Sequence, residues 1–368
     1  MLRSLPQSGK QSTFQDIVLM ANVYFIPLST DPDEAELSAA GKKLLEKAVT
    51  AENIALEQEI PLKLHFGERG NFTYLKPGVY DGMIDFLEEH DVKSVFAETS
   101  VLYGGERFNR EKHTALAISH GFTRLPVFIA DGAKGEEAVE IPVGLRHFKS
   151  VSIAAGLAKH EQCLVVSHFK GHMLAGFGGA IKQLSMGFAS KGGKMAMHLG
   201  VKPRIISMLC KKCGACQKRC QAGAVSCTSG KFRIDRSKCI GCGACFSICP
   251  AHAVSIFSLG GFWNALFKGR FFREKLVEYA CGSAKGKKHI YVTFAVNITR
   301  GCDCEPRPMR TVAPNIGIFA STDPVAIDAA CYDAVKQTGK AFKGYEILEY
   351  AQNIGTGSMQ YDLQTIDH

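Results

Sequence analysis

Eight cysteines between positions 210 and 249 carry the clearest chemical signal in this sequence. They form two runs with one spacing, Cys-x2-Cys-x2-Cys-x3-Cys, and Pro250 directly follows the second run. The runs are Cys210, Cys213, Cys216 and Cys220, then Cys239, Cys242, Cys245 and Cys249. Thiolates are soft ligands that bind zinc and iron–sulfur clusters, so the spacing predicts metal chemistry.

The spacing matches the ligand pattern of bacterial two-cluster ferredoxins, in which the fourth cysteine of each run binds the other cluster. We therefore expect two 4Fe–4S clusters. Their ligands would be Cys210, Cys213, Cys216 and Cys249 for one, and Cys239, Cys242, Cys245 and Cys220 for the other. Gly214 and Gly243 allow the loop backbone to approach the cluster sulfides. Gln221 departs from the pattern, because proline is expected after Cys220.

A pair of zinc knuckles is the alternative, since Cys-x2-Cys pairs also bind zinc. Structural zinc usually takes four ligands per ion, often including histidine. Three closely spaced cysteines with a distant fourth are typical of a cuboidal cluster instead. The sequence therefore favours iron–sulfur clusters over zinc.

Residues 65–71, His-Phe-Gly-Glu-Arg-Gly-Asn, follow an apolar segment that we expect to be a strand. The carboxyl ends of parallel strands are where α/β folds place their ligands. Glu68 and Arg69 are therefore candidates for binding an anionic or polar substrate. A surface turn closed by a salt bridge is the alternative.

Residues 167–172, Ser-His-Phe-Lys-Gly-His, also follow an expected strand. We predict that His168 donates a proton near a redox-active substrate and that Lys170 and His172 line the same pocket. Two histidines four residues apart can bind a metal on a helix, but a loop does not provide that geometry. A loop that only packs against the cysteine-rich segment is the alternative.

Glycine-rich turns follow, at residues 176–182 and 187–194, and contain Lys182, Lys191 and Lys194. Such turns can bind phosphate through backbone N–H groups. Neither the P-loop nor the dinucleotide-binding glycine pattern is present, so the sequence predicts no particular nucleotide.

Cys302, Asp303 and Cys304 form a third compact group. Two thiolates and a carboxylate are a soft ligand set, so an additional metal site at Cys302 and Cys304 is one hypothesis. A redox pair of neighbouring cysteines would be strained, and two inert buried cysteines are a further alternative.

The composition is that of a globular protein: 368 residues, 46% hydrophobic and 21% charged. No run of 18 apolar residues is present, so we expect no membrane span. The net charge of +9 is scattered along the sequence and gives little support for nucleic-acid binding. Cysteines that bind clusters rather than form disulfides favour a cytoplasmic location.

Strands and helices alternate along the remaining sequence, which predicts a mainly parallel α/β sheet. We expect strands at 23–27, 61–66, 94–98, 127–130, 147–153, 163–167, 289–296 and 316–320. We expect helices at 34–58, 80–89, 110–121, 154–160 and 262–279, and one opening at Asp323-Pro324 with Thr322 or Asp323 as its N-cap.

The cysteine-rich segment interrupts this alternation, so we predict an α+β two-cluster ferredoxin-like domain inserted into an α/β scaffold. The predicted divisions are a poorly ordered extension 1–20, a first α/β part 21–205, the ferredoxin-like domain 206–257, an amphipathic linker helix 258–284 and a second α/β part 285–368. The linker helix is expected to pack domains together, with contact to a partner as the alternative.

Motifs in a fixed order resemble one family. They are residues 65–71, 167–172, 176–182, 194–198, both cysteine runs, 302–304 and 318–328. Over most of residues 21–350 the chain resembles the uncharacterised Fe–S center proteins, a family of unknown function with a ferredoxin inserted in an α/β domain. The resemblance implies iron–sulfur binding and no particular substrate. Gln221 and the first 20 residues depart from the pattern.

The main hypothesis is an iron–sulfur protein whose two 4Fe–4S clusters transfer single electrons to or from a site in the α/β domain, as an oxidoreductase would. That site would be lined by Glu68, Arg69, His168, Lys170, His172 and Lys182. One rival is a non-catalytic electron carrier that docks on a partner enzyme through the helix at 262–279. Another is a metal- or cluster-handling protein that uses Cys302 and Cys304.

Overall fold

The computed structural model describes residues 20–102, 105–199, 203–220, 223–239, 244–255 and 268–367. Of the predicted extension at 1–20, only Met20 is among the described residues. Cys242 of the second cysteine run also lies outside them. None of the described helices is both long enough and apolar enough to span a membrane.

Eight strands of the described residues form one sheet in the order β16-β1-β15-β14-β7-β2-β3-β4. Their bounds are β1 Ala21–Pro27, β2 Leu62–Lys63, β3 Phe96–Glu98, β4 Val127–Ile129, β7 Leu164–His168, β14 Ile290–Ala295, β15 Gly317–Ser321 and β16 Tyr361–Thr365. All neighbouring strands are parallel except β15, which is antiparallel to both β1 and β14. The prediction of a mainly parallel α/β sheet is confirmed.

The reversed direction of β15 has a simple cause. A parallel strand pair needs a long crossover, usually a helix, that returns the chain to the starting edge. The connection from β14 to β15, residues 296–316, contains no helix. The chain therefore turns back beside β14, and the connection lies at the carboxyl end of that strand, where it carries Cys302, Asp303 and Cys304.

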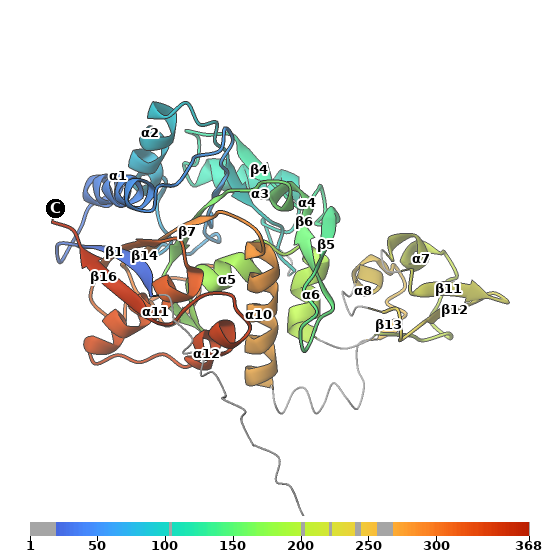
Figure 1. The fold of residues 1–368 in the computed structure, drawn as a ribbon. Coiled ribbons are helices and arrows are strands. Elements are labelled where there is room, and N and C mark those ends of the chain that lie inside the picture. The colour runs from blue at the N-terminus through green and yellow to red at the C-terminus, as the bar shows by residue number, and fades with distance from the viewer. Residues whose placement is uncertain are drawn as a thin grey trace, which may run out of the picture.

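Helices cover both faces of the sheet (Figure 1). One face packs against α1 Glu34–Ala51 and α2 Asp81–Glu89, with α3 Arg110–Ser119 nearby. The other face packs against α5 Ala180–Ser185, α10 Lys268–Ala284, α11 Pro324–Gln337 and α12 Glu346–Asn353. The remaining helices of the scaffold are α4 Ala155–Ala158, α6 Lys191–Leu199 and the short η1 Pro77–Tyr80.

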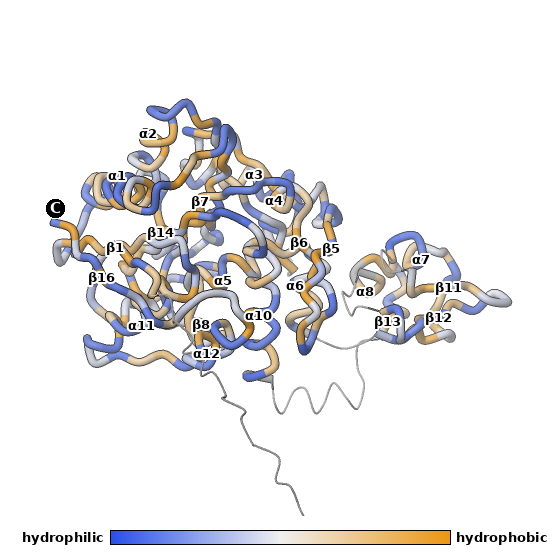
Figure 2. Tube along the Cα trace, viewed as in Figure 1, coloured by the Kyte–Doolittle hydropathy of each residue, from blue (hydrophilic) through white to orange (hydrophobic). Residues whose placement is uncertain are grey.

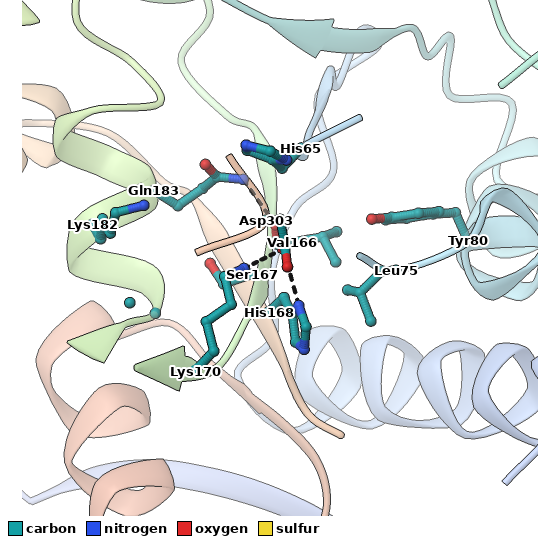
Figure 3. A pocket seen from close by; sticks show the side chains of 12 residues that line it. His65, Leu75, Tyr80, Val166, Ser167, His168, Lys170, Lys182, Gln183 and Asp303 are labelled. Carbon is teal, nitrogen blue, oxygen red and sulfur yellow. Dashed lines mark hydrogen bonds and ion pairs between the residues drawn. The ribbon is translucent and has the colours of Figure 1, made fainter. Parts of the chain in front are cut away.

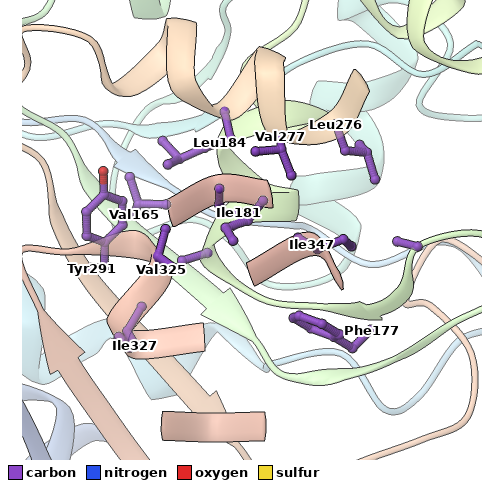
Figure 4. Packing of buried hydrophobic residues seen from close by; sticks show 14 of the residues in the cluster. Val165, Phe177, Ile181, Leu184, Leu276, Val277, Tyr291, Val325, Ile327 and Ile347 are labelled. Atoms are coloured by element: carbon purple, nitrogen blue, oxygen red, sulfur yellow. The ribbon is translucent and has the colours of Figure 1, made fainter. Parts of the chain in front are cut away.

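The central strands are apolar on both sides, as a sheet covered by two helix layers requires. In β7, Leu164 and Val166 face the core beneath α1 and α2, whereas Val165 faces the opposite core. Figure 4 shows Val165 among side chains from α5, α10 and α11. Figure 2 shows hydrophilic segments along the outside of the described part of the scaffold.

Helix boundaries follow capping residues. Asp33 caps α1 by accepting a hydrogen bond from the Glu36 backbone N–H at 2.8 Å. The helix ends at Ala51, earlier than predicted, because the chain turns at Asn53, which has a φ of 49°. Asp323 caps α11, whose first residue is Pro324, as predicted.

The helix predicted as a linker belongs to the scaffold. The described part, α10, buries Phe272, Leu276, Val277 and Ala280 in the core that also contains side chains of α5 and α12. These apolar side chains are therefore not available to a partner protein. The predicted start of this helix, including Trp263, lies outside the described residues.

The remaining described strands form four small pairs. They are β5 Ala138–Pro142 with β6 Ser150–Ala154, β8 Lys170–His172 with β9 Gly176–Gly178, β10 Arg204–Ile205 with β13 Val254–Ser255, and β11 Val225–Thr228 with β12 Lys231–Ile234. The last two pairs, with α7 Ala215–Arg219 and α8 Ala244–Ile248, form the cysteine-rich segment, residues 203–255. This segment interrupts the chain between α6 and α10 (Figure 1).

Candidate functional site

Polar and charged side chains meet at the carboxyl ends of four neighbouring parallel strands, β14, β7, β2 and β3. Asp303 follows β14, His168 ends β7, His65 follows β2 and Glu98 ends β3. This edge is where ligands bind in open α/β sheets. Two adjoining cavities lie here and share His65, Lys182 and Gln183 in their walls.

The first, which we call the His168 cavity, has about 400 Å³ of space free of protein atoms, including its open mouth. Asp303, His168 and Lys170 line it together (Figure 3). Oδ2 of Asp303 accepts a hydrogen bond from Lys170 and lies 3.0 Å from Nδ1 of His168. Burial favours the neutral acid, but the charges of Lys170 and His168 prevail and hold the pKa of Asp303 well below its ordinary value.

Both ring nitrogens of His168 are engaged. Nε2 lies 2.7 Å from the carbonyl oxygen of Val296, which can only accept, so Nε2 carries a hydrogen. Nδ1 faces the Asp303 carboxylate. His168 is thus held at both ring nitrogens and supports Asp303. The geometry favours this positioning role over the proton donation to substrate that we predicted.

The other carboxylate oxygen of Asp303, Oδ1, is buried and has no hydrogen-bond partner in the described part of the chain. Buried polar atoms of folded proteins are nearly always paired. Asp303 thus keeps a free acceptor in the wall of the His168 cavity.

Cys302 lies behind this carboxylate and is almost fully buried. Its Sγ accepts hydrogen bonds from Nζ of Lys182 at 3.3 Å and from the Cys304 backbone N–H at 3.5 Å. A hydrogen bond from the Cys304 thiol and the charge of Lys182 hold the pKa of Cys302 well below its ordinary value, despite burial. The same pairing raises the pKa of Cys304. Cys302 is therefore the thiolate of the pair.

Among the described residues, no third metal ligand lies beside Cys302 and Cys304, where an additional metal site was predicted. Among the residues that the structure describes, no three His, Cys, Asp or Glu side chains converge as the ligands of a single ion would. The ammonium of Lys182 occupies the position beside the Cys302 sulfur instead.

The second cavity, which we call the lysine cavity, has about 790 Å³ of space free of protein atoms, including its open mouth. Lys182, Lys194, His172 and Cys304 contribute to its wall. Burial lowers the pKa of Lys194 to about 8, although nearby Asp131 opposes this shift. Of the three lysines in the glycine-rich turns, Lys191 lines neither cavity; its Nζ donates to the carbonyl of Phe108.

Between the cavities and α3 lies an ionic network that the sequence reasoning largely missed. Arg107 is buried and its guanidinium lies 3.2 Å from the carboxylates of both Glu68 and Glu98. Glu98 also pairs with Lys63 at 2.8 Å. One feature of the sequence could have indicated this network. Lys63 lies in an otherwise apolar strand, and a charge in a buried strand needs a partner.

The structure separates the two neighbouring residues predicted to bind substrate. Glu68 is buried and belongs to this network through Arg107. Arg69 is exposed, pairs with Glu106 and lines neither cavity. The expectation that Arg69 lines the pocket is therefore wrong, and the alternative of a surface salt bridge describes this residue. The side chains of Glu68 and Arg69 point to different surroundings because the chain turns here, at Gly67 and Gly70, which both have positive φ.

A buried carboxylate positions Lys182. Asp328 of α11 accepts hydrogen bonds from the backbone N–H groups of Ala180 at 2.6 Å and Ile181 at 2.9 Å, at the first turn of α5. A Cβ on Gly179 would overlap Asp328, so this turn requires glycine. Burial raises the pKa of Asp328 to about 7. The contact joins α11 to the helix that carries Lys182 and Gln183.

The cysteine-rich segment contains two copies of one local structure. Each cysteine of the second run lies 29 positions after its counterpart in the first, and α8 likewise follows α7. The strand pairs match as well: Ile205 pairs with Val254, and its counterpart Ile234 pairs with Val225. The segment therefore has internal two-fold symmetry in its chain path.

Its cysteines gather around a small core. Cys216 and Cys245 are buried with Val225, Phe232 and Val254. Cys210, Cys220 and Cys249 pack against this core, whereas Cys213 is exposed. Cys239 is half-buried, and Cys242 lies outside the described residues. No disulfide links the cysteines of the described residues.

The fold and the site define a mixed α/β protein with paired cavities at the carboxyl edge of its sheet and a cysteine-rich segment between two scaffold helices. The chain belongs to the family described as "Domain of unknown function (DUF362)", whose model matches residues 60–333. No curated protein matches the chain.

Two solved structures are similar to parts of the chain. A protein from Thermotoga maritima is 12% identical, with a TM-score of 0.43 over 85% of this chain and 60% of that one. The lactate racemase apoprotein from Thermoanaerobacterium thermosaccharolyticum is 11% identical, with a TM-score of 0.32 over 75% of this chain and 51% of that one. The chain thus spans less than two thirds of either.

Proposed function

We propose that this protein is an iron–sulfur electron-transfer protein, with two 4Fe–4S clusters in the cysteine-rich segment that exchange single electrons with a redox site at the paired cavities. One observation carries the proposal. Sγ of Cys220 accepts the backbone N–H of Ala224 at 3.2 Å, and Sγ of Cys249 accepts that of Ala253 at 3.3 Å. The two copies thus hold their fourth cysteine in the same way, and N–H bonds to sulfur tune the reduction potentials of iron–sulfur clusters.

The donor set fits clusters better than single zinc ions. Zinc draws four ligands around one ion at about 2.3 Å from each sulfur. Three closely spaced cysteines with a distant fourth suit a cuboidal cluster better than one ion, and Cys210, Cys216, Cys220, Cys245 and Cys249 all contribute to or pack against one small apolar core. A cuboidal cluster spaces its thiolates more widely, because each binds a different corner. A partly apolar environment also limits the access of water to a cluster.

Metal and sulfide analysis of anaerobically purified protein tests the proposal. We expect about eight irons and eight acid-labile sulfides per chain. Cys216→Ala and Cys245→Ala should each lower both contents. Cys227→Ser is the matched control, because Cys227 is an exposed cysteine of β11 in the same segment but outside both runs. Zinc in place of iron, or an equal loss in the control, would refute the clusters.

A second candidate, an electron carrier that docks on a partner, is favoured by the charge distribution. Residues 203–255 contain nine Lys and Arg but only one acid, Asp235, so they supply nearly all of the chain's net charge. The expectation of scattered charge was therefore wrong. Met208 and Leu209 are exposed directly beside the exposed Lys211 and Lys212. An apolar patch edged by cations suits an acidic electron-transfer protein.

Stopped-flow reduction by an acidic flavodoxin tests this candidate. Lys211→Glu/Lys212→Glu should slow reduction by roughly tenfold or more at low salt, while excess dithionite still reduces all clusters. The control is Lys336→Glu/Lys343→Glu, which changes the net charge by the same amount but on the scaffold. It should leave the reduction rate unchanged. Loss of tRNA binding in the first variant, with an unchanged reduction rate, would assign the basic surface to nucleic acid instead.

A further inference from the structure

Two lysine side chains in the wall of the lysine cavity have no carboxylate partner. Lys182 donates to the sulfur of Cys302. Lys194 donates to the hydroxyl of Thr99 at 2.6 Å and to the carbonyl of Ser100 at 2.5 Å. Among the described residues, neither ammonium forms an ion pair with Asp or Glu. Charges removed from water are normally paired. The Cys302 thiolate balances Lys182, whereas Lys194 contacts only uncharged oxygens, so the demand for an anion at this cavity comes mainly from Lys194.

The carboxylates near this cavity are already committed. Glu98, the only acid in its wall among the described residues, pairs with Lys63 and Arg107. Asp131 attracts Lys194 electrostatically, but its oxygens accept the backbone N–H and the hydroxyl of Ser100 at 3.0–3.1 Å. The protein therefore leaves part of the positive charge at this cavity for a ligand.

His172 adds an uncharged donor to the same wall. Its Nδ1 accepts backbone N–H groups of Leu174 at 3.2 Å and Ala175 at 3.0 Å. Burial and the charge of Lys182 lower the pKa of His172 to about 3, so the ring is neutral at pH 7. With Nδ1 acting as an acceptor, the single hydrogen of the neutral ring sits on Nε2.

The rest of the wall is apolar in part. Val101, Leu102, Met186 and Phe272 line the cavity together with the cationic groups. Cavities that bind small molecules commonly combine apolar walls with a few placed polar groups. An inorganic anion alone would leave these apolar side chains without a partner.

We infer that the lysine cavity binds a small organic oxyanion, with its carboxylate or phosphate group at Lys182, Lys194 and His172 and a short apolar body against Met186 and Phe272. The inference deepens the proposed function, because it gives a ligand class to the redox site proposed there. The binding itself requires no iron.

Calorimetric titration with benzoate, benzamide and inorganic phosphate tests the inference. Benzoate should bind, whereas benzamide, which has the same shape without the charge, should bind at least about tenfold more weakly. Phosphate should also bind more weakly than benzoate, because it lacks an apolar body. Equal binding of benzoate and benzamide would overturn the inference.

Lys194→Gln and Lys182→Gln should each weaken benzoate binding by roughly tenfold, the effect of losing one charge-assisted hydrogen bond. Lys191→Gln is the matched control, because Lys191 begins the helix that carries Lys194 but lies outside the cavity. Equal weakening in the control would contradict a defined site. Near-ultraviolet circular dichroism verifies that each variant is folded.

Iron is measured in the same samples, which keeps the two proposals separate. Benzoate binding in protein that lacks iron would refute the clusters and support the oxyanion site. Full iron content without benzoate binding would support the clusters and refute the oxyanion site.

Discussion

The Lys182 ammonium donates a hydrogen bond to the sulfur of Cys302, whose pKa lies well below its ordinary value. Because the ammonium stabilises the thiolate, Lys182→Met should raise the pKa of Cys302. We expect iodoacetamide to label Cys302 roughly tenfold more slowly at pH 7 in this variant. Fragment mass spectrometry distinguishes Cys302 from Cys304. Lys191→Met serves as the control, and an unchanged labelling rate in Lys182→Met would argue against the contact.

Lys194 makes oxyanion binding dependent on pH. Its ammonium faces Thr99 and Ser100, and the nearby charges are Asp131, Glu98, Lys63 and Arg107. With a pKa of about 8, Lys194 is charged below pH 8 and neutral above it. Benzoate stays ionised throughout, so its affinity should be constant at pH 6–7 and fall between pH 7.5 and 9.

Calorimetry across that range measures the effect. The fall should be absent in Lys194→Gln, whose affinity is already low. A wild-type affinity that stays constant up to pH 9 would contradict the role of Lys194.

His168 illustrates a role that residue type alone does not reveal. His168→Ala should leave the iron content unchanged, because the residue lies outside the cysteine-rich segment. It removes one of the two side chains that contact Oδ2 of Asp303, so we expect redox turnover to fall. His168→Gln, whose amide can still donate to Asp303, should restore part of it. Turnover that is normal in the alanine variant would exclude a functional role for His168.

At the scale of elements, the contact between Asp328 and the first turn of α5 joins two helices through a buried acid. Removal of this acceptor by Asp328→Ala should destabilise the protein by about 1–3 kcal/mol, because two backbone N–H groups lose their partner. Urea denaturation measures the change. Asp362→Ala on the edge strand β16 is the control and should have little effect.

Asp328 also makes stability depend on pH. Its folded-state pKa of about 7 exceeds the ordinary value, so the folded protein binds a proton more tightly than the unfolded chain. This contribution is fully present below about pH 4 and is lost as pH rises through 7. The wild type should therefore lose stability between about pH 4 and 7 relative to Asp328→Asn. Parallel pH profiles of the two proteins would contradict this assignment.

The sequence predicted the positions of strands and helices better than their arrangement in the sheet. The strands at β1, β3, β7, β14 and β15 and the N-cap Asp323 follow from local patterns of apolar and capping residues, and these were confirmed. The reversed direction of β15 was not predicted, because pairing depends on the length and path of a connection. The edge strand β16 and helix α12 were missed. Strand β16 is largely polar, and α12 is amphipathic but only eight residues long, too short for a clear helical period.

The same distinction applies to the site. His168, Lys170 and His172 were found because they directly follow a strand, and all three line the paired cavities. Arg107 acquires its importance from partners distant in the sequence, and no local pattern shows that, whereas the glycine-rich turn had already indicated Lys194. Local sequence patterns therefore located the site at the edge of the sheet, but they did not show which charged side chains pair with one another there.

At the scale of the whole molecule, the scaffold and the cysteine-rich segment have separate cores of very different size. The core of the segment contains only a few buried side chains, too few for independent stability in a small domain. Under the proposed function, bound clusters supply the missing stabilisation. Iron chelation should therefore abolish hydrogen-exchange protection in residues 203–255 and leave strands β7 and β14 protected. Loss of protection in both regions would contradict separate cores.

The position of β1 between β15 and β16 also bears on how the protein is made. The ribosome synthesises β1 well before β15 and β16, its two neighbours in the sheet. This end of the sheet therefore cannot close until β15 and β16 have been made, and until then β1 exposes two unpaired edges that invite aggregation. The cysteine-rich segment emerges during this interval, so under the proposed function its clusters would have time to assemble before the scaffold closes.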